Sequence, residues 1–290
     1  MGEKNFLKLA VKAKNLFLYD VAIKYLEQAA ELGNSEAMYL LGDIFANDYY
    51  YFGHLFKDDE QIKTDDVQAL KWYKRAADNG LGKAFIEVAV LSLNEEQYNS
   101  KQAEKFFKAA ITTYKSLSGN GNIFAMKTLA EIYEKYYFAE SLNTGYERKN
   151  SRIGTCYKMA FSALKKLADR GNIEAKFQIS DMVRCGKGTD ENIEQSIAIL
   201  KSVAEIAKNS DDKITAYRKI AEIILSEYET KTSAINFYKQ AAALGDFISM
   251  RELWKIYELG KVVKKNLSES QKWLKKSEEL QKKFFEEIRL

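Results

Sequence analysis

The chain contains no proline, two cysteines and one histidine among its 290 residues. Without proline there is no polyproline segment, no proline-rich linker and no proline to break a helix. The two cysteines, Cys156 and Cys185, make no disulfide framework and suggest a reducing compartment. Glycine, with 15 residues, is left as the main residue that interrupts regular structure. These absences favour helices joined by short turns.

The charge is nearly balanced, with 45 Lys and Arg against 41 Asp and Glu and a net charge of +4. Such a small excess does not predict nucleic-acid binding by itself. Lysines interrupt the apolar residues of segment 1–17, which therefore lacks the apolar core of a signal peptide, and no later run reaches transmembrane length. We expect a cytoplasmic protein, and the composition, rich in Lys, Asn and Ile, suggests a bacterial source.

An internal repeat extends along the whole chain. The segment AIKYLEQAAELG at 22–33 returns as ALKWYKRAADNG at 69–80 and as AINFYKQAAALG at 234–245. Each copy has a small residue, bulky residues three and four positions later, and small residues at seven and eight, which lie on one helical face. Weaker copies begin at Ala103, Ala160, Ser196 and Ser270. A closing glycine supplies the left-handed position that ends the helix, at Gly33, Gly80, Gly171 and Gly245.

A second pattern alternates with the first. It places a small residue, an aliphatic residue four positions later and a small residue at five, as in Ala37, Leu41 and Gly42. Further copies begin at Ala84, Ala125, Ala175, Ala216 and Ser249, the last with Trp254 in the fifth position. Small residues at fixed points let neighbouring helices approach closely. We expect these segments to be the first helices of helix pairs that stack on one another, because no pair can bury its apolar face alone.

The strings EAMYLLGDIF (36–45) and ALKWYKRAADNG (69–80) resemble a Sel1-like repeat, a relative of the tetratricopeptide repeat. The turn and helix CGKGTDENIEQSIAIL (185–200) resembles the same family. The resemblance implies an all-α, right-handed superhelical solenoid of about seven antiparallel helix pairs, acting as a scaffold and carrying no catalytic residues. We divide the single array, 1–290, into units 1–33, 35–80, 83–121, 122–171, 172–209, 213–245 and 246–281, with a capping helix to residue 290.

Two units are lengthened between their helices, at 47–66 and 134–156. Insertions on one face of a repeat array often bind partners, and tyrosine is favoured in protein interfaces. An alternative is that the first helices run longer and their aromatic residues pack on the neighbouring unit. The predicted partner-binding residues are Tyr49, Tyr50, Tyr51, Phe52, His54, Phe56, Tyr136, Tyr137, Phe138, Tyr146, Arg148 and Lys149.

The first helices offer a weaker candidate, a concave surface with an interrupted row of acids. Its predicted residues are Tyr39, Asp43, Glu131, Phe177, Asp181, Arg218 and Glu222. The spacing favours a simpler alternative. Lys127 with Glu131 and Arg218 with Glu222 are pairs four residues apart, which decorate a solvated helix face.

No motif for catalysis, a metal or a cofactor stands out. The single His54 and the two distant cysteines give no metal-ligand spacing. The sequence GKGT at 186–189 lacks the earlier glycine and the preceding strand of a phosphate loop, so we interpret it as a repeat turn. We therefore expect no catalytic residue, no metal, no cofactor and no small-molecule substrate, but one or a few protein partners.

Three functions remain open. The first is a non-enzymatic scaffold or adaptor for protein partners. The second, a narrower form of the first, is an immunity or inhibitor protein that neutralises a bacterial toxin or effector enzyme. The third is a regulatory adaptor with weak nucleic-acid or membrane-surface contact through a basic C-terminus, where residues 246–290 carry 11 basic against 8 acidic side chains. Nucleic acid is the less favoured ligand. Monomeric and dimeric states both remain open.

Overall fold

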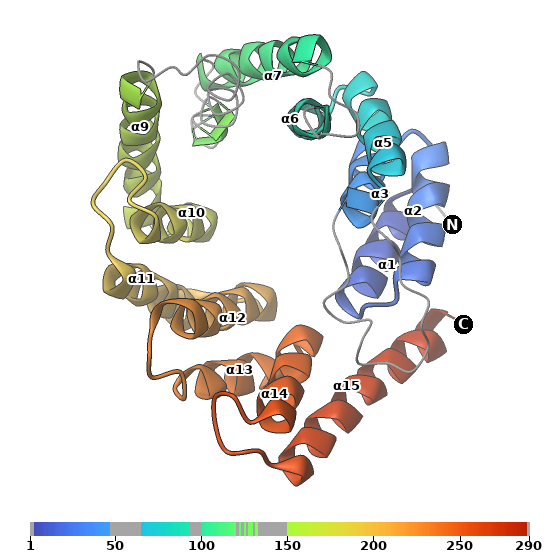
Figure 1. The fold of residues 1–290 in the computed structure, drawn as a ribbon, viewed down its shortest axis with the longest axis vertical. Helices are drawn as coiled ribbons and strands as arrows, with labels where there is room; N and C mark the ends of the chain where they lie inside the picture. Colours follow the sequence, from blue (N-terminus) through green and yellow to red (C-terminus); the bar gives the residue numbers. More distant parts are fainter. Residues whose placement is uncertain are drawn as a thin grey trace. The chain divides into compact units, whose positions relative to one another are not determined.

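The structure, a computed structural model, describes residues 3–46, 65–92, 100–119, 122, 125, 127–129, 131–132 and 150–288. Every regular element among these residues is an α-helix, and no strand occurs in them (Figure 1). The all-α fold class predicted from the repeat pattern is confirmed.

The chain divides into two compact units, 1–156 and 157–290. The first contains α1 (Glu3–Asn15), α2 (Tyr19–Glu31), α3 (Ser35–Ala46), α5 (Asp66–Asp78), α6 (Gly82–Leu91) and α7 (Ser100–Gly119). The second contains α10 (Ile173–Arg184), α11 (Ile193–Ile206), α12 (Ser210–Glu227), α13 (Ala234–Ala243), α14 (Phe247–Leu259) and α15 (Leu267–Ile288). Most of α9 (Asn150–Asp169) also belongs to the second unit.

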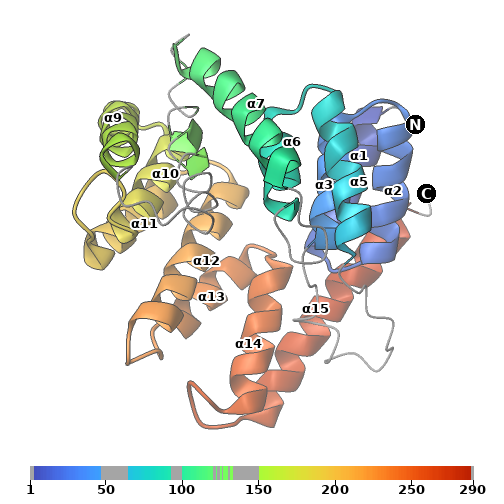
Figure 2. The ribbon, with the colours of Figure 1, turned by 45° about the horizontal axis from the view of Figure 1, so that its top comes forward.

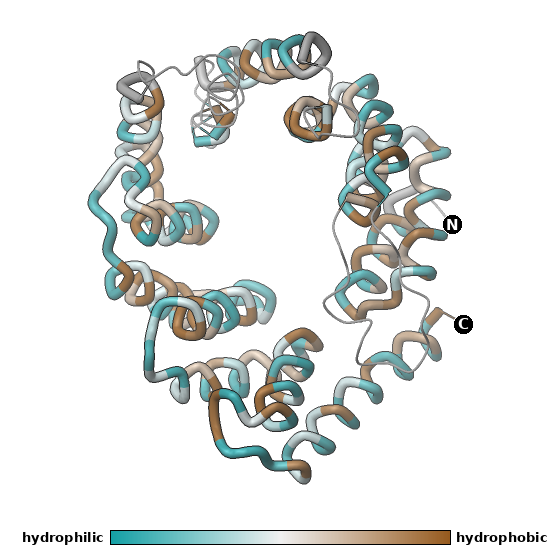
Figure 3. The backbone as a smooth tube through the Cα atoms, viewed as in Figure 1, coloured by the Kyte–Doolittle hydropathy of each residue, from teal (hydrophilic) through white to brown (hydrophobic). Residues whose placement is uncertain are grey.

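Within each unit, helices pack on their neighbours along the chain. In the first unit the contacts run from α1 through α2, α3, α5 and α6 to α7, and in the second from α10 through α11, α12, α13 and α14 to α15. Figure 2 shows α14 and α15 side by side. Apolar and polar residues alternate along the helices (Figure 3) because one face of each is buried. We call α1, α3, α6, α10, α12 and α14 the first helices, and the others the second helices.

Small residues at the helix contacts are buried, as the repeat pattern predicts. The leading residues Ala37, Ala84, Ala175, Ala216 and Ser249 are all 0% exposed. At Gly42, five positions after Ala37, a Cβ atom would lie 2.6 Å from the Cδ1 atom of Tyr73. The ring of this second-helix tyrosine thus lies directly against the backbone of α3, where no side chain fits.

Four of the turns from a second helix to the next first helix are built on a left-handed glycine. Gly33, Gly80, Gly171 and Gly245 have φ values of 89°, 85°, 88° and 95°, which confirms their predicted role. The amide of Gly33 donates to the carbonyl of Ala30, and the amide of Asn34 donates to that of Ala29. The Asn34 side chain then accepts from the amide of Ala37 at 2.8 Å. One glycine and one cap therefore end a helix and begin the next.

Asn172 and Asp246 cap the following first helices in the same way. The side chain of Asn172 accepts from the amide of Ala175, and that of Asp246 from the amide of Ser249. In each case the capped amide belongs to the leading small residue of the first helix. The turn and the helix contact are therefore held in a fixed register.

Three of the turns within helix pairs share a backbone hydrogen bond. The amide of Asn192 donates to the carbonyl of Val183 at 2.9 Å, and the amide of Asn266 donates to that of Tyr257 at 2.9 Å. The amide of Asp65 donates to the carbonyl of Phe45 at the same distance. All three carbonyls stand eight positions after the leading small residue. The longest turn is therefore closed by the same bond as the two short ones.

The GKGT sequence lies in the turn between α10 and α11, as expected for a repeat turn. Gly186 and Gly188 both have positive φ values. A Cβ atom at Gly188 would lie 2.4 Å from the carbonyl oxygen of Tyr157. Glycine is needed there because the turn passes directly against the backbone of α9.

We expect Gly42→Ala to lower the free energy of unfolding by about 1–3 kcal/mol, because the added methyl group overlaps a Tyr73 ring that is only 2% exposed. The control is Gly154→Ala in α9, where no atom lies within 4 Å of the new Cβ. That change removes a glycine from a helix and should raise stability by about 0.5–1 kcal/mol. Urea unfolding followed by circular dichroism measures both, and equal effects would contradict the close contact.

We also expect the turn between α3 and α5 to be replaceable by a shorter one. In the variant, residues 184–191 stand in place of residues 46–64, between the same hydrogen-bonded positions. Thermal unfolding of this chimaera should remain cooperative, with a Tm within a few degrees of the original because turn length costs little free energy. Loss of the cooperative transition would show that residues 46–64 support the packing.

Candidate binding surface

The predicted insertion residues lie outside the described part of the chain. This applies to Tyr49, Tyr50, Tyr51, Phe52, His54, Phe56, Tyr136, Tyr137, Phe138, Tyr146, Arg148 and Lys149. Their role in partner binding stays a prediction. The boundaries of the lengthened segments differ from those expected: Asp66 begins α5, and residues 150–156 belong to α9.

The two predicted aromatic residues of the concave surface are largely packed into the fold. Phe177 is 7% exposed and belongs to the core. The Tyr39 ring lies 5.2 Å from the Tyr73 ring, between centroids, and the Lys83 ammonium stands 4.0 Å from the Tyr39 centroid. Burial, reinforced by the charge of Glu87, raises the pKa of the Tyr39 hydroxyl above its ordinary value. Tyr39 is therefore a neutral residue that anchors a helix contact.

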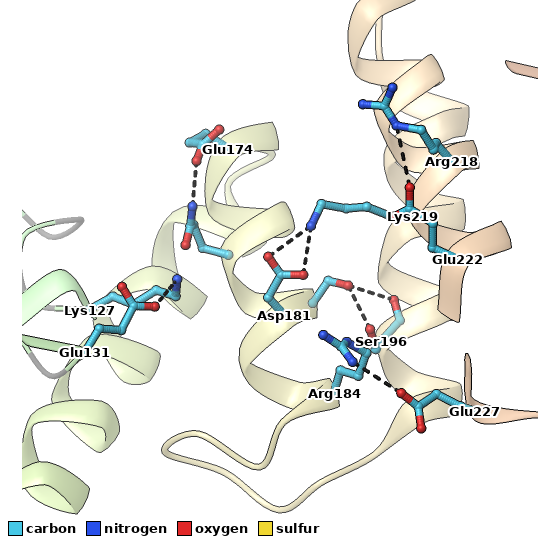
Figure 4. A network of polar contacts seen from close by, with 12 residues as sticks. Lys127, Glu131, Glu174, Asp181, Arg184, Ser196, Arg218, Lys219, Glu222 and Glu227 are labelled. Atoms are coloured by element: carbon cyan, nitrogen blue, oxygen red, sulfur yellow. Dashed lines mark hydrogen bonds and ion pairs between the residues drawn. The ribbon is translucent and has the colours of Figure 1, made fainter. Parts of the chain in front are cut away.

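The acids six positions after the leading small residues are each joined to a cation. Asp43 pairs with Lys14, and Glu131 pairs with Lys127 at 2.7 Å. Asp181 accepts two hydrogen bonds from the Lys219 ammonium, at 3.0 and 3.1 Å (Figure 4).

Glu222 completes the row of acids, 3.8 Å from the Nε atom of Arg218. The two ion pairs with a spacing of four residues, at 127–131 and 218–222, are those predicted for a solvated helix face. The acidic row is consequently neutralised by the chain itself.

Further ion pairs join one first helix to the next one along the chain. Arg218 of α12 reaches Asp246, the cap of α14, at 3.4 Å. Such pairs include Lys14–Asp43, Glu36–Lys83, Asp181–Lys219, Arg184–Glu227 and Arg218–Asp246. We call them the inter-repeat ion pairs. Their partners stand 28 to 47 positions apart in the chain, so a local sequence pattern does not reveal them.

Among the described residues Arg251 is the largest fully buried side chain, with 0% exposure, and it lies two positions after the leading residue Ser249. Its guanidinium carbon is 4.2 Å from the ring centroid of Trp254. Burial lowers the pKa of this guanidinium to about 10, against the opposing effect of Glu278 and Glu252, so the group stays charged at neutral pH. A cation over an aromatic ring explains why a bulky Trp replaces the usual small residue in α14.

Other chemical groups are sparse in the described segments. No group of three or more His, Cys, Asp or Glu side chains that could hold a metal ion occurs among these residues. Cys156 is half-buried and Cys185 is exposed, and both are thiols. None of the described helices is both long enough and apolar enough to cross a membrane.

Comparison with protein families identifies the repeat. The Sel1 repeat family matches residues 18–34, 35–81, 231–246 and 255–281. These segments cover α2, the pair α3 and α5, α13, and the end of α14 with most of α15. The further resemblance at 185–200 lies outside them. No curated protein matches the chain.

Solved structures with similarity to the chain include a Sel1 repeat protein from Oxalobacter formigenes, with 19% identity over 94% of this chain and 99% of that one and a TM-score of 0.36. A protective antigen of uropathogenic Escherichia coli displaying an SLR fold has 22% identity over 96% and 62%, and a TM-score of 0.34. A Pseudomonas aeruginosa protein has 12% identity over 96% and 81%, and a TM-score of 0.35. Likeness at this level says nothing about the function of this chain.

We expect the Asp181–Lys219 pair to contribute a coupling energy of about 0.5–1 kcal/mol, because it joins two helices and both side chains are about one third exposed. A double-mutant cycle of Asp181→Ala and Lys219→Ala, followed by urea unfolding, measures it. The matched pair is Lys165–Asp169, which lies within α9 with exposures of 58% and 63%. Its coupling should be only about 0.3 kcal/mol. Equal couplings for the two pairs would argue against a role in stacking.

Proposed function

Since the chain is a Sel1-like repeat protein, we propose that it is a non-enzymatic scaffold or adaptor that holds one or a few protein partners on its first helices. Sel1 repeats generally mediate protein–protein interaction, and proteins built from them are generally non-catalytic. We take the whole chain as one array of the seven units defined above. The cytoplasm is its proposed location, in keeping with a sequence that holds only two cysteines, Cys156 and Cys185.

The inter-repeat ion pairs are the observation that carries this proposal. They use charges of the first helices to hold successive first helices beside one another. A surface whose side chains are already ordered loses less conformational entropy when a partner binds. Neutralised acids also leave a surface of mixed charge, which favours recognition by charge pattern over general attraction to cations.

The second unit offers the exposed part of this surface. Glu222 is 56% exposed and Asp181 is 36% exposed, on neighbouring first helices, while Arg218, which contacts Glu222, is 25% exposed. A partner that brings a basic side chain to Glu222 would compete with the weak 3.8 Å contact to Arg218. We propose a partner of mixed charge for this face.

Neutralisation of a toxin or effector enzyme is a narrower form of the same proposal. It requires one partner in a fixed ratio, whereas a general adaptor retains several partners. Capture with the tagged full-length chain from its source cells, followed by mass spectrometry, separates the two forms. A hydrolase or transferase activity that a single substitution in the array abolishes would contradict the scaffold proposal itself.

We expect Glu222→Lys to weaken capture of the main partner about tenfold, because it reverses the charge of the most exposed acid on the proposed face. The matched control is Glu205→Lys, which changes an exposed acid on the second helix α11. Titration of the purified partner gives both affinities. If both variants bind normally and the chimaera lacking residues 46–64 does not, the lengthened turn is the binding site and the first-helix face is not.

A further inference from the structure

A strongly basic stretch covers the turn between α14 and α15 and the first part of α15. Residues 259–276 contain six lysines and one acid, whereas the whole chain carries a net charge of only +4. The lysines are Lys261, Lys264, Lys265, Lys272, Lys275 and Lys276, and the acid is Glu269. Glu269 is itself paired with Lys272 at 3.1 Å. The remainder of α15 carries more acids than bases, so the positive charge is concentrated at the turn.

Apolar side chains are exposed at the same turn. Leu259 is 57% exposed and Leu267 is 52% exposed, while Val262 and Val263 between them are half-buried. Figure 3 shows the connection between α14 and α15 as an apolar stretch followed by a hydrophilic one. Single exposed apolar residues are ordinary on protein surfaces, but two exposed leucines and two half-buried valines within nine residues, interleaved with lysines, form a patch.

The turn is held in a fixed conformation. Gly260 has a φ of 68°, and the amide of Asn266 closes the turn on the carbonyl of Tyr257. Glu258 accepts a hydrogen bond from the Ser270 hydroxyl at 2.8 Å and pairs with Lys265 at 3.4 Å. Lys265 therefore serves the turn itself. Lys261 and Lys264 are exposed beside the apolar side chains.

The repeat does not require this composition. The turn between α10 and α11 is closed by the equivalent hydrogen bond, but it carries Asp190 and Glu191 and exposes no large apolar side chain. Its Gly188 is packed against α9. Of these two turns, only the one after α14 is both basic and apolar.

We propose that the turn between α14 and α15 binds the surface of membranes that contain anionic lipids. Lysines at its sides bind lipid phosphates, and Leu259 and Leu267 enter the boundary between headgroups and acyl chains. A protruding turn suits a lipid surface, whereas an amphipathic peptide needs a groove. Nucleic acid is disfavoured because single strands stack on exposed aromatic rings, and the aromatic residues on either side of the turn, Tyr257 and Trp273, are only 9% and 6% exposed.

The charges and the apolar side chains contribute separately to the affinity. Each lysine near an anionic surface strengthens binding about fivefold, which corresponds to about 1 kcal/mol. Replacing Lys261 and Lys264 by Gln should therefore weaken binding about 25-fold. Replacing both leucines by Ser should weaken it by about an order of magnitude. Because neither group of residues suffices alone, binding should be reversible and sensitive to salt.

The test uses the full-length chain and vesicles of phosphatidylcholine, with and without phosphatidylglycerol, in a sedimentation assay. The variants are Lys261→Gln with Lys264→Gln, and Leu259→Ser with Leu267→Ser. Matched controls in the same unit are Lys208→Gln with Lys231→Gln, and Ile206→Ser with Leu244→Ser, which change exposed residues elsewhere. Circular dichroism melting confirms that every variant is folded. A Val262→Trp variant reports insertion as a blue shift of its added fluorescence.

We expect binding to the anionic vesicles only, weakened about 25-fold in the lysine variant and about tenfold in the leucine variant, and kept in both controls. Absence of binding to anionic vesicles, equal binding to neutral ones, or equal loss in the controls would overturn the proposal. Polyglutamate and single-stranded DNA serve as competitors. If either displaces the vesicles and the leucine variant binds normally, the turn is a site for soluble polyanions. No protein partner takes part in the assay, so its outcome is independent of the scaffold proposal.

Discussion

Stacking of helix pairs depends on small residues in the first helices. At these positions a side chain from a neighbouring helix can lie directly against the backbone. The ring of Tyr73 lies against the backbone of α3 at Gly42, and the leading residues of the other first helices are alanine or serine with no exposure. Close approach increases the number of favourable packing contacts and leaves little space for relaxation. Caps, turns and ion pairs then act on helices whose separation is already set.

Much of the fold could be predicted because its signals are local. The helix faces follow from spacings of three, four, seven and eight residues, and Gly33 and Gly245 were expected to be left-handed because each closes an apolar helix pattern. The caps Asn34 and Asp246 directly follow these glycines, so the same short pattern contains them too. Such features depend on a few neighbouring residues and do not require knowledge of which pairs touch.

Less of the candidate surface could be predicted because it depends on distant partners. Asp181 stands in the expected acidic row, but its cation, Lys219, comes from the next first helix. Phe177 was expected on the surface, yet the packing of its own unit buries it. Trp254 broke the repeat pattern without an evident reason until the buried Arg251 beside it was seen. In each case the environment of the residue depends on a contact that the spacing of residues in the sequence does not predict.

The hydrogen bond from Asp65 to Phe45 has a consequence for how such a chain changes over generations. Both atoms belong to the backbone, and the bond matches those that close the much shorter turns at Val183 and Tyr257. The length of this hydrogen bond is therefore the same whether the turn between the two residues is short or long. A repeat of this kind can acquire a new segment in one genetic event and keep its stacking intact. Sequence changes and insertions are then tolerated at the turns, whereas close packing limits the substitutions that the helices accept.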